Sequence, residues 1–425
     1  MKNRSNIISI ALLLIVIMAG LAYWYFVFNK SDNADPVTID TGDDTANGFM
    51  PLNGDPSITP DFGTGNDDIR ATPETNSATP TSATIPTLRL LSNTPVGGYG
   101  ALTTATTTII RWVDRGRGNI FEVNTLKNDV VTLSNTVLPR VYDSIWNTNL
   151  TAFIGTLISS DSSKTTTLYA ELQKQTIPTS TTPFSLKGKN ISDSLIGYAV
   201  SPNGNQIFLM INENEKGIGY TANFDGSRMT RIFDTPMTEV NVEWPETNTI
   251  AITTKGISSQ PGFLYFVNPK TGVWKKILGP VYGLSTRTSH DAKYVIVSAS
   301  GSNNDVLTGI YNVTKSANTD AVVRTLADKC SWGNFYKKLV YCAVPSKPTS
   351  GVYPDAWYRG TLSLVDKIWQ IDAETNEVNL ISSIVDESDR VIDAFNLGTD
   401  NKDQFLFFVN KNDLSLWSLD LVASQ

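Results

Sequence analysis

The feature that most constrains the fold is a pair of short apolar strands that recurs seven times between residue 87 and the end of the chain. In each pair, an apolar run is followed by a second run of the form Leu-Tyr/Trp-x-x-Asp/Asn, and Gly, Asn, Asp or Pro residues separate the two. Short runs of β-branched and aromatic residues between such turn residues are typical of strands. The first members are 108–113, 151–158, 206–211, 249–254, 294–299, 338–344 and 404–409. The second members are 119–129, 167–173, 217–227, 263–272, 309–316, 367–377 and 414–421.

The repeat predicts an all-β, seven-bladed β-propeller over residues 87–425. Its spacing of roughly 40 to 60 residues is that of four-stranded propeller blades, and one blade is stable only when it packs against its neighbours. The last unit lacks a fourth strand after 414–421, whereas 88–91 is an unpaired strand before the first unit. We expect 88–91 to complete the last blade and close the ring. Six or eight blades are the alternative counts if units are misread.

The turns resemble those of a known repeat family. Residues 201–208 (SPNGNQIF) are similar to the S-P-D-G-K-x-I-A/F hairpin of TolB-type, WD40-like propeller repeats. Residues 290–295 are a looser copy, and 223–226 match the D-G turn that follows the third strand in that family. The resemblance implies a propeller with a protein-binding or scaffolding role, and it implies no particular ligand. Independently of the family, Asn-Gly supplies the positive φ angles that a tight hairpin needs.

The N-terminal region predicts a membrane anchor. Residues 7–28 form a run of 22 residues without a charge, and a helix of that length, about 33 Å, matches a hydrocarbon core of about 30 Å. Lys2 and Arg4 precede the run, so we expect residues 1–6 in the cytoplasm and the propeller outside the cytoplasmic membrane, periplasmic or extracellular. The alternative is a signal peptide cleaved near the small residues at 20–22.

Residues 29–86 predict a disordered linker between this single-pass transmembrane helix and the propeller. The segment contains 7 Pro, 10 Thr and 9 Asp and few large apolar side chains. Such a composition cannot bury enough apolar surface to offset the loss of chain entropy on folding. We therefore expect a tether.

Cys330 and Cys342 are the only cysteines and lie on the first two strands of the sixth unit. A turn centred near Tyr336 places position 330 opposite 342 and position 332 opposite 340. Cross-strand neighbours can reach disulfide geometry, and disulfides persist outside the cytoplasm. We expect a disulfide here, with two buried free thiols as the alternative.

Composition excludes several classes of chemistry. The single histidine, His290, falls in a predicted hairpin turn, so His-based catalytic dyads and His-rich metal sites are excluded. A net charge of −7 argues against non-specific nucleic-acid binding. We expect no metal, no cofactor and a monomeric propeller. Paired-carboxylate hydrolysis stays open, because the spatial separation of carboxylates cannot be read from the sequence.

One loop departs from the repeat. Residues 345–366 separate the second and third strands of the sixth unit, where other units use about four to twelve residues. Loops at this position emerge on the rim that carries the inter-blade connections, where propellers commonly bind ligands, and aromatic residues with Arg are typical of interface hot spots. The alternative is that Trp357 folds back as a cover over the blade or channel. The partner-binding candidates are Tyr353, Asp355, Trp357, Tyr358 and Arg359.

These features together predict a membrane-anchored, extracytoplasmic propeller that binds or scaffolds another protein of the cell envelope. The alternative function is an envelope glycan-binding or glycan-cleaving propeller that uses carboxylates at the channel mouth. No catalytic residue can be named from the sequence.

Overall fold

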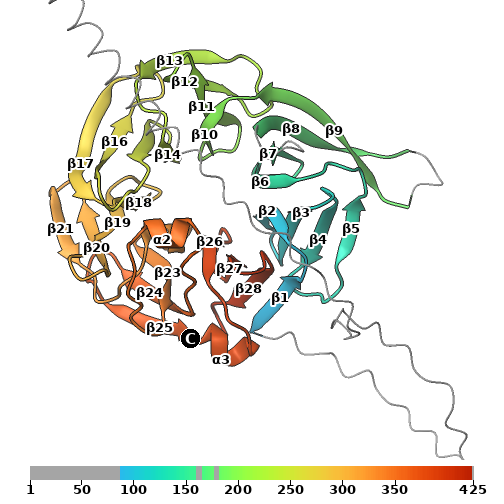
Figure 1. The fold of residues 1–425 in the computed structure, drawn as a ribbon. Helices are drawn as coiled ribbons and strands as arrows, with labels where there is room; N and C mark the ends of the chain where they lie inside the picture. The colour runs from blue at the N-terminus through green and yellow to red at the C-terminus, as the bar shows by residue number, and fades with distance from the viewer. Residues whose placement is uncertain (1–86, 159–164, 177–180, 424–425) are drawn as a thin grey trace, which may run out of the picture. The chain divides into compact units, whose positions relative to one another are not determined.

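The computed structural model describes residues 87–158, 165–176 and 181–423, which belong to the compact unit Pro80–Gln425. Among these residues the structure has seven four-stranded antiparallel sheets arranged in a ring (Figure 1). Each of the seven predicted strand pairs forms the second and third strands of one sheet. The domain is a seven-bladed β-propeller.

The blades are numbered here from the first complete one, and their strands run from the central axis outward. Blade 1 comprises β2 (Val96–Thr103), β3 (Thr108–Asp114), β4 (Ile120–Asn124) and β5 (Val131–Ser134). Blade 2 comprises β6 (Val141–Trp146), β7 (Ala152–Ile158), β8 (Thr165–Lys174) and β9 (Phe184–Ser192). Blade 3 comprises β10 (Leu195–Val200), β11 (Gln206–Glu213), β12 (Lys216–Asn223) and β13 (Thr230–Thr235). Blade 4 comprises β14 (Val240–Glu246), β15 (Thr249–Thr254), β16 (Pro261–Val267) and β17 (Trp274–Tyr282).

The remaining blades carry the short helices. Blade 5 comprises β18 (Ser285–Thr288), β19 (Tyr294–Ser300), β20 (Val306–Asn312) and β21 (Ala317–Asp320). The 3-10 helix η1 (Ala327–Lys329) leads into blade 6. Blade 6 comprises β22 (Cys330–Trp332), β23 (Leu339–Pro345), β24 (Asp366–Asp372) and β25 (Val378–Ser382). The short helix α2 (Asp355–Tyr358) lies between β23 and β24. After α3 (Ile384–Ser388), blade 7 comprises β26 (Ala394–Thr399), β27 (Phe405–Asn410), β28 (Leu416–Asp420) and β1 (Leu88–Ser92).

The two ends of the domain close the ring. Strand β1 pairs antiparallel with β28, with Leu88 opposite Leu419 and Leu90 opposite Trp417. Leu91 is buried in the core cluster between blades 1 and 7. The predicted closure of the last blade by residues 88–91 is therefore confirmed, and the blade count of seven is correct.

The core lies between blades. The second strand of each blade is buried on both faces, as in β11 and β27, because each face of its sheet packs against a neighbouring blade. The tryptophans serve this packing: Trp112 clusters with Phe407 of blade 7, and Trp244 with Phe208 of blade 3. Aromatic side chains bury large areas, which is why they dominate these interfaces.

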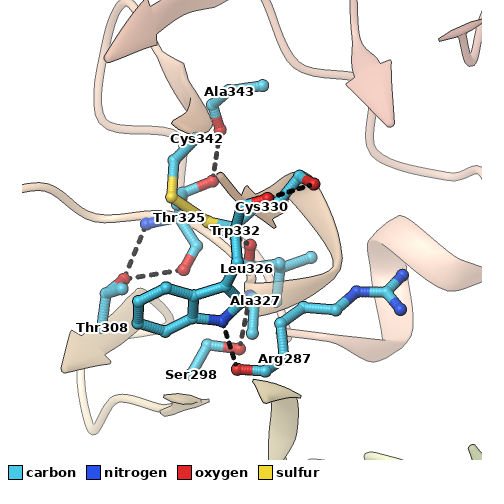
Figure 2. The surroundings of a disulfide bond; sticks show 11 residues. Arg287, Ser298, Thr308, Thr325, Leu326, Ala327, Cys330, Trp332, Cys342 and Ala343 are labelled. Atoms are coloured by element: carbon cyan, nitrogen blue, oxygen red, sulfur yellow. Dashed lines mark hydrogen bonds between the residues drawn. A yellow bond between two sulfur atoms is a disulfide. The ribbon is translucent and has the colours of Figure 1, made fainter. Parts of the chain in front are cut away.

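The expected disulfide joins Cys330 to Cys342 in blade 6 (Figure 2). The predicted register is confirmed, with Cys330 opposite Cys342 and Trp332 opposite Val340. Both cysteines are buried between blades 5 and 6, where Trp332 donates a hydrogen bond from Nε1 to the Arg287 carbonyl at 2.9 Å.

The predicted transmembrane helix at 7–28 and the predicted linker at 29–86 lie outside the described residues. Within the described residues, no helix has the length and apolarity needed to cross a membrane.

Candidate partner-binding face

One face of the propeller carries the inter-blade connections. In an antiparallel blade, the loop between the second and third strands emerges on the same side as the chain that enters the next blade. We call this side the connection face. It carries the segment 345–366, named here the blade 6 insertion, and Figure 1 shows its helix α2 on the inner side of blade 6.

The blade 6 insertion is tied to blades 4, 5 and 6. The backbone N–H of Ser258, in the blade 4 loop, donates to Asp355 Oδ2 at 2.8 Å. Ser300, at the end of β19 in blade 5, donates from Oγ to the Tyr353 carbonyl at 2.5 Å. Tyr358 donates from its hydroxyl to Asp328 Oδ2 at 2.8 Å, next to the channel. These contacts fix the insertion across the connection face.

The five predicted binding residues are brought together by α2, but they differ in exposure. Tyr353 and Trp357 are buried, with exposed fractions of 3% and 4%. Asp355 and Tyr358 are half-buried, and Arg359 is exposed. The structure thus gives Trp357 the covering position that the sequence left open. Partner binding by these residues stays a prediction.

Beneath Trp357 lies a buried ionic cluster, which we name the Lys329 cluster. Lys329, Asp366 and Asp393 have no side-chain exposure to solvent. Lys329 Nζ lies 2.7 Å from Asp366 Oδ2 and also contacts Asp393 Oδ1. It lies 5.3 Å from the centre of the Trp357 ring.

Asp393 is held by further donors. Trp357 Nε1 donates to Asp393 Oδ1 at 3.1 Å and Oδ2 at 3.0 Å, and the backbone N–H of Leu364 donates to Oδ2 at 3.0 Å. Asp366 Oδ2 accepts from the Ala394 backbone N–H at 2.7 Å, while its Oδ1 has no hydrogen-bond partner among the described residues. Burial raises the pKa of Asp366 to about 6, and the Lys329 ammonium opposes this rise.

A groove of about 810 Å³ runs between blades 5 and 6 beside the insertion. Residues 346–350 of the insertion form one wall, and the blade 5 segment 303–306 forms part of the other. We call it the inter-blade groove. Its apolar and aromatic lining consists of Val306, Val322, Val323, Val344, Pro345, Pro348, Tyr353, Trp369 and Val378.

The charges on the inter-blade groove are mostly positive. Arg324, Lys347 and Lys367 line it, against one carboxylate, Asp305. None of the three cations forms an ion pair within the described part of the chain. Val322 is 74% exposed beside them. The groove therefore combines an apolar surface with unpaired positive charge, in a protein whose net charge is negative.

The central channel is polar. A cavity of about 510 Å³ is lined mainly by residues of the innermost strands, including the carboxylates Asp143 and Glu243, together with Asp328 of η1. Each carboxylate has a partner. Tyr198 donates to Asp143 at 2.9 Å, Arg287 Nη1 lies 3.2 Å from Glu243, and Ser285 and Tyr358 both donate to Asp328.

Two groups in the channel, Asp143 and Tyr198, have raised pKa values. Desolvation raises the pKa of Asp143, although its side chain faces the open channel, and the hydrogen bond from Tyr198 opposes this rise. Desolvation also raises the pKa of Tyr198, and the charge of Asp143 acts in the same direction. The pair can therefore hold its phenolic proton between the two oxygens over a wide pH range.

The described residues contain no group of three or more His, Cys, Asp or Glu side chains arranged to hold a metal ion. His290 is exposed in the turn before β19, as predicted.

Apart from Tyr353 and the insertion itself, the residues of the groove and of the Lys329 cluster were not predicted from the sequence. The groove joins the end of blade 5 to the insertion, and the Lys329 cluster joins residues up to 64 positions apart. The one sequence feature that pointed to the Lys329 cluster was the position of Lys329 and Asp366, two charged residues directly at the starts of predicted apolar strands.

Similarity to known proteins is limited to solved structures. No family model and no curated protein matches the chain. Among solved structures it is similar to TolB from Acinetobacter baumannii, at 11% identity and a TM-score of 0.41, over 66% of this chain and 61% of TolB. It is also similar to the β-propeller domain of the Trilobed protease from Pyrococcus furiosus, at 10% identity and a TM-score of 0.48, over 78% of this chain and 96% of that domain. It is similar as well to oligogalacturonate lyase from Vibrio parahaemolyticus, at 10% identity and a TM-score of 0.48, over 78% of this chain and 91% of the lyase. The chain thus spans less than two thirds of TolB.

Proposed function

We propose that this protein is a membrane-anchored, extracytoplasmic propeller that binds a segment of another envelope protein in the inter-blade groove. The observation that carries the proposal is the groove itself. It is large, the exposed residues Val322 and Pro348 line it, and the insertion that departs from the repeat builds one wall. Concave sites with a mainly apolar lining and a few charged groups are typical binding sites.

The chemistry of the groove indicates the class of partner. Apolar side chains of the partner would occupy the surface formed by Val322, Trp369 and Val378. Carboxylates flanking them would pair with Arg324 and Lys347, whose guanidinium and ammonium groups have no internal partner among the described residues. The partner is therefore an extended, acidic segment with apolar side chains.

Two features support the location. Residues 7–28 predict a membrane span, and the buried Cys330–Cys342 disulfide is of a kind that persists in oxidising compartments. A phosphatase reporter that folds only outside the cytoplasm, fused after Gln425, tests the location. An active reporter is expected, and an inactive one on a stably produced fusion would contradict the location.

A photo-reactive amino acid placed at Val322 tests the binding role in the natural host. Val322 is 74% exposed at the groove, and Val273, 65% exposed on a blade 4 turn, provides the matched control position. We expect a discrete cross-linked partner at position 322 and none at 273. The same products at both positions, or none at 322, would contradict the groove assignment.

A second candidate function rests on the channel, where three carboxylates line one cavity. We propose as the alternative that this cavity takes an envelope glycan, since Tyr, Asn and carboxylate side chains are suited to sugar hydroxyls. Isothermal titration with a glycan panel tests it. Binding that Asp143→Asn abolishes and Arg324→Glu leaves unchanged would favour the channel over the groove, and no binding to any glycan would remove this alternative.

A further inference from the structure

The Lys329 cluster contains every group that amide formation between a lysine and a carboxylate requires. The amine and both carboxylates are excluded from solvent, so water can neither solvate the charges nor compete as a nucleophile. Lys329 Nζ contacts Asp393 Oδ1, which places the amine against the carboxyl group. Contacts of this kind give intramolecular reactions very high effective concentrations.

The other oxygen of Asp393 lies in a pocket of two N–H donors. Trp357 Nε1 and the Leu364 backbone N–H both donate to Oδ2 at 3.0 Å. Those are the distances at which paired donors stabilise the oxyanion of a tetrahedral intermediate. Both donors belong to the blade 6 insertion, so the buried Trp357 side chain is placed to stabilise the oxyanion.

Asp366 is placed to move protons. Its Oδ2 lies 2.7 Å from Lys329 Nζ, and its Oδ1 has no hydrogen-bond partner among the described residues. A carboxyl group in such a site takes a proton from the ammonium more readily than one in water, because burial disfavours its charged form.

We propose that Lys329 and Asp393 condense to an intramolecular isopeptide bond that joins blade 6 to blade 7. Lys329 Nζ passes one ammonium proton to Asp393 Oδ1 across their contact, which leaves a free amine and a neutral carboxyl group. The amine attacks Cγ of Asp393, and Asp366 accepts the second proton from Nζ. Negative charge develops on Oδ2, where Trp357 and Leu364 donate. Oδ1 departs as water with these two protons, the second returned from Asp366, so that one C–N bond forms, one C–O bond breaks and no oxidant is needed.

The consequence for the cluster is the removal of two buried charges. An ammonium and a carboxylate become a neutral amide, and the released water leaves a site where ions are poorly solvated. Lys329 lies at the end of η1 next to Cys330, while Asp393 directly precedes β26. The isopeptide bond and the disulfide would thus tie three successive parts of the ring, β22, β23 and β26, together.

Peptide mapping of the purified full chain tests the proposal without any variant. After reduction, alkylation and trypsin digestion, the isopeptide bond prevents cleavage at Lys329. We expect a branched product of residues 325–337 joined to 391–402, lighter than the two separate peptides by one water. Recovery of only separate peptides, with cleavage after Lys329, would show a simple buried ion pair and overturn the proposal.

The same digest contains an internal control. Lys338 and Glu374 are also in contact, but both are about half exposed, and within the described part of the chain no N–H group other than the Lys338 ammonium donates to the Glu374 carboxylate. We expect this pair to remain unlinked. An equal extent of linkage there would show that contact alone, or sample handling, accounts for the product.

The variant Asp366→Asn tests the proton-transfer role. It keeps the size of the side chain and removes its ability to accept a proton, so we expect a folded protein with less than a tenth of the wild-type linkage. Full linkage in folded Asp366→Asn would overturn the role of Asp366. If the variant does not fold, the wild-type digest alone decides whether the bond exists.

Discussion

The Lys329 cluster concentrates buried charge at a single point of the domain. Before the proposed isopeptide bond forms, two carboxylates and one ammonium, all without solvent exposure, leave one negative charge in excess, and burying such a charge is costly. Burial raises the pKa of Asp366 from its ordinary 3.8 to about 6. Folded protein therefore keeps a proton on Asp366 at pH values where the unfolded chain has released it.

From this group we expect the free energy of unfolding to fall as pH rises from about 4 to about 6, by about 1.4 kcal/mol for each unit of pKa difference. The stabilisation by protonated Asp366 is fully present below the pKa that Asp366 has in the unfolded chain. It is lost as pH rises through the pKa that Asp366 has in the folded protein. Urea unfolding of wild type and of Asp366→Asn at several pH values isolates it, because Asn does not titrate. A stability difference that stays constant over this range would contradict the raised pKa.

Trp357 packs over the same cluster and donates to Asp393. We expect Trp357→Ala to lower the free energy of unfolding by about 3–5 kcal/mol, because it leaves a cavity and an unpaired buried acceptor. Arg359→Ala, an exposed change two residues away, should stay within about 0.5 kcal/mol of wild type. Equal effects of the two substitutions in denaturant unfolding would contradict the covering position of Trp357.

At the scale of single elements, β1 holds the ring closed. It contributes Leu88 and Leu90 to the packing between blades 6 and 7, and Leu91 to that between blades 7 and 1. Without it, β28 would present an unpaired edge. Closure therefore depends on five residues that are distant in sequence from the blade they complete.

A chain that begins at residue 93 should accordingly be less stable than one that begins at residue 80. We expect a loss of about 5 kcal/mol or more, since three packed leucines are removed together. Thermal unfolding followed by circular dichroism measures this, and a chain that begins at 87 serves as the control with β1 intact. Matching unfolding curves for the chains that begin at 80 and 93 would contradict the role of β1 in closure.

The elements also show what a sequence can and cannot predict. The seven strand pairs and the register of Cys330 against Cys342 were predictable, because strand patterning and hairpin pairing depend on residues close in sequence. The sequence left the burial of Trp357 open, because it depends on Lys329, Asp393 and Leu364, which meet only after blades 6 and 7 have packed. The inter-blade groove was missed for the same reason, since two blades form it.

At the scale of the whole molecule, the distribution of charge matters more than its sum. The chain carries a net charge of −7, yet the inter-blade groove carries three cations and one carboxylate. Residues 1–86 hold 10 acidic and 4 basic residues, so residues 87–425 carry 31 acidic and 30 basic residues and are close to neutral. The groove is therefore a local excess of positive charge that attracts an acidic partner and favours one docking position. Because the cations are accessible, we expect this attraction to weaken with salt.

A charge-reversal experiment tests the binding role most directly. Fluorescence anisotropy measures the binding of two extended peptides with apolar residues, an acidic one flanked by glutamates and a basic one flanked by lysines. Each peptide is titrated with three proteins: wild type, R324E/K347E and the control K216E/K275E. The control carries the same charge change at exposed sites on blades 3 and 4. We predict that the acidic peptide binds wild type and the control variant at least tenfold more tightly than R324E/K347E, and that the basic peptide prefers R324E/K347E. Equal binding of the acidic peptide by all three proteins would contradict the groove as the partner-binding site.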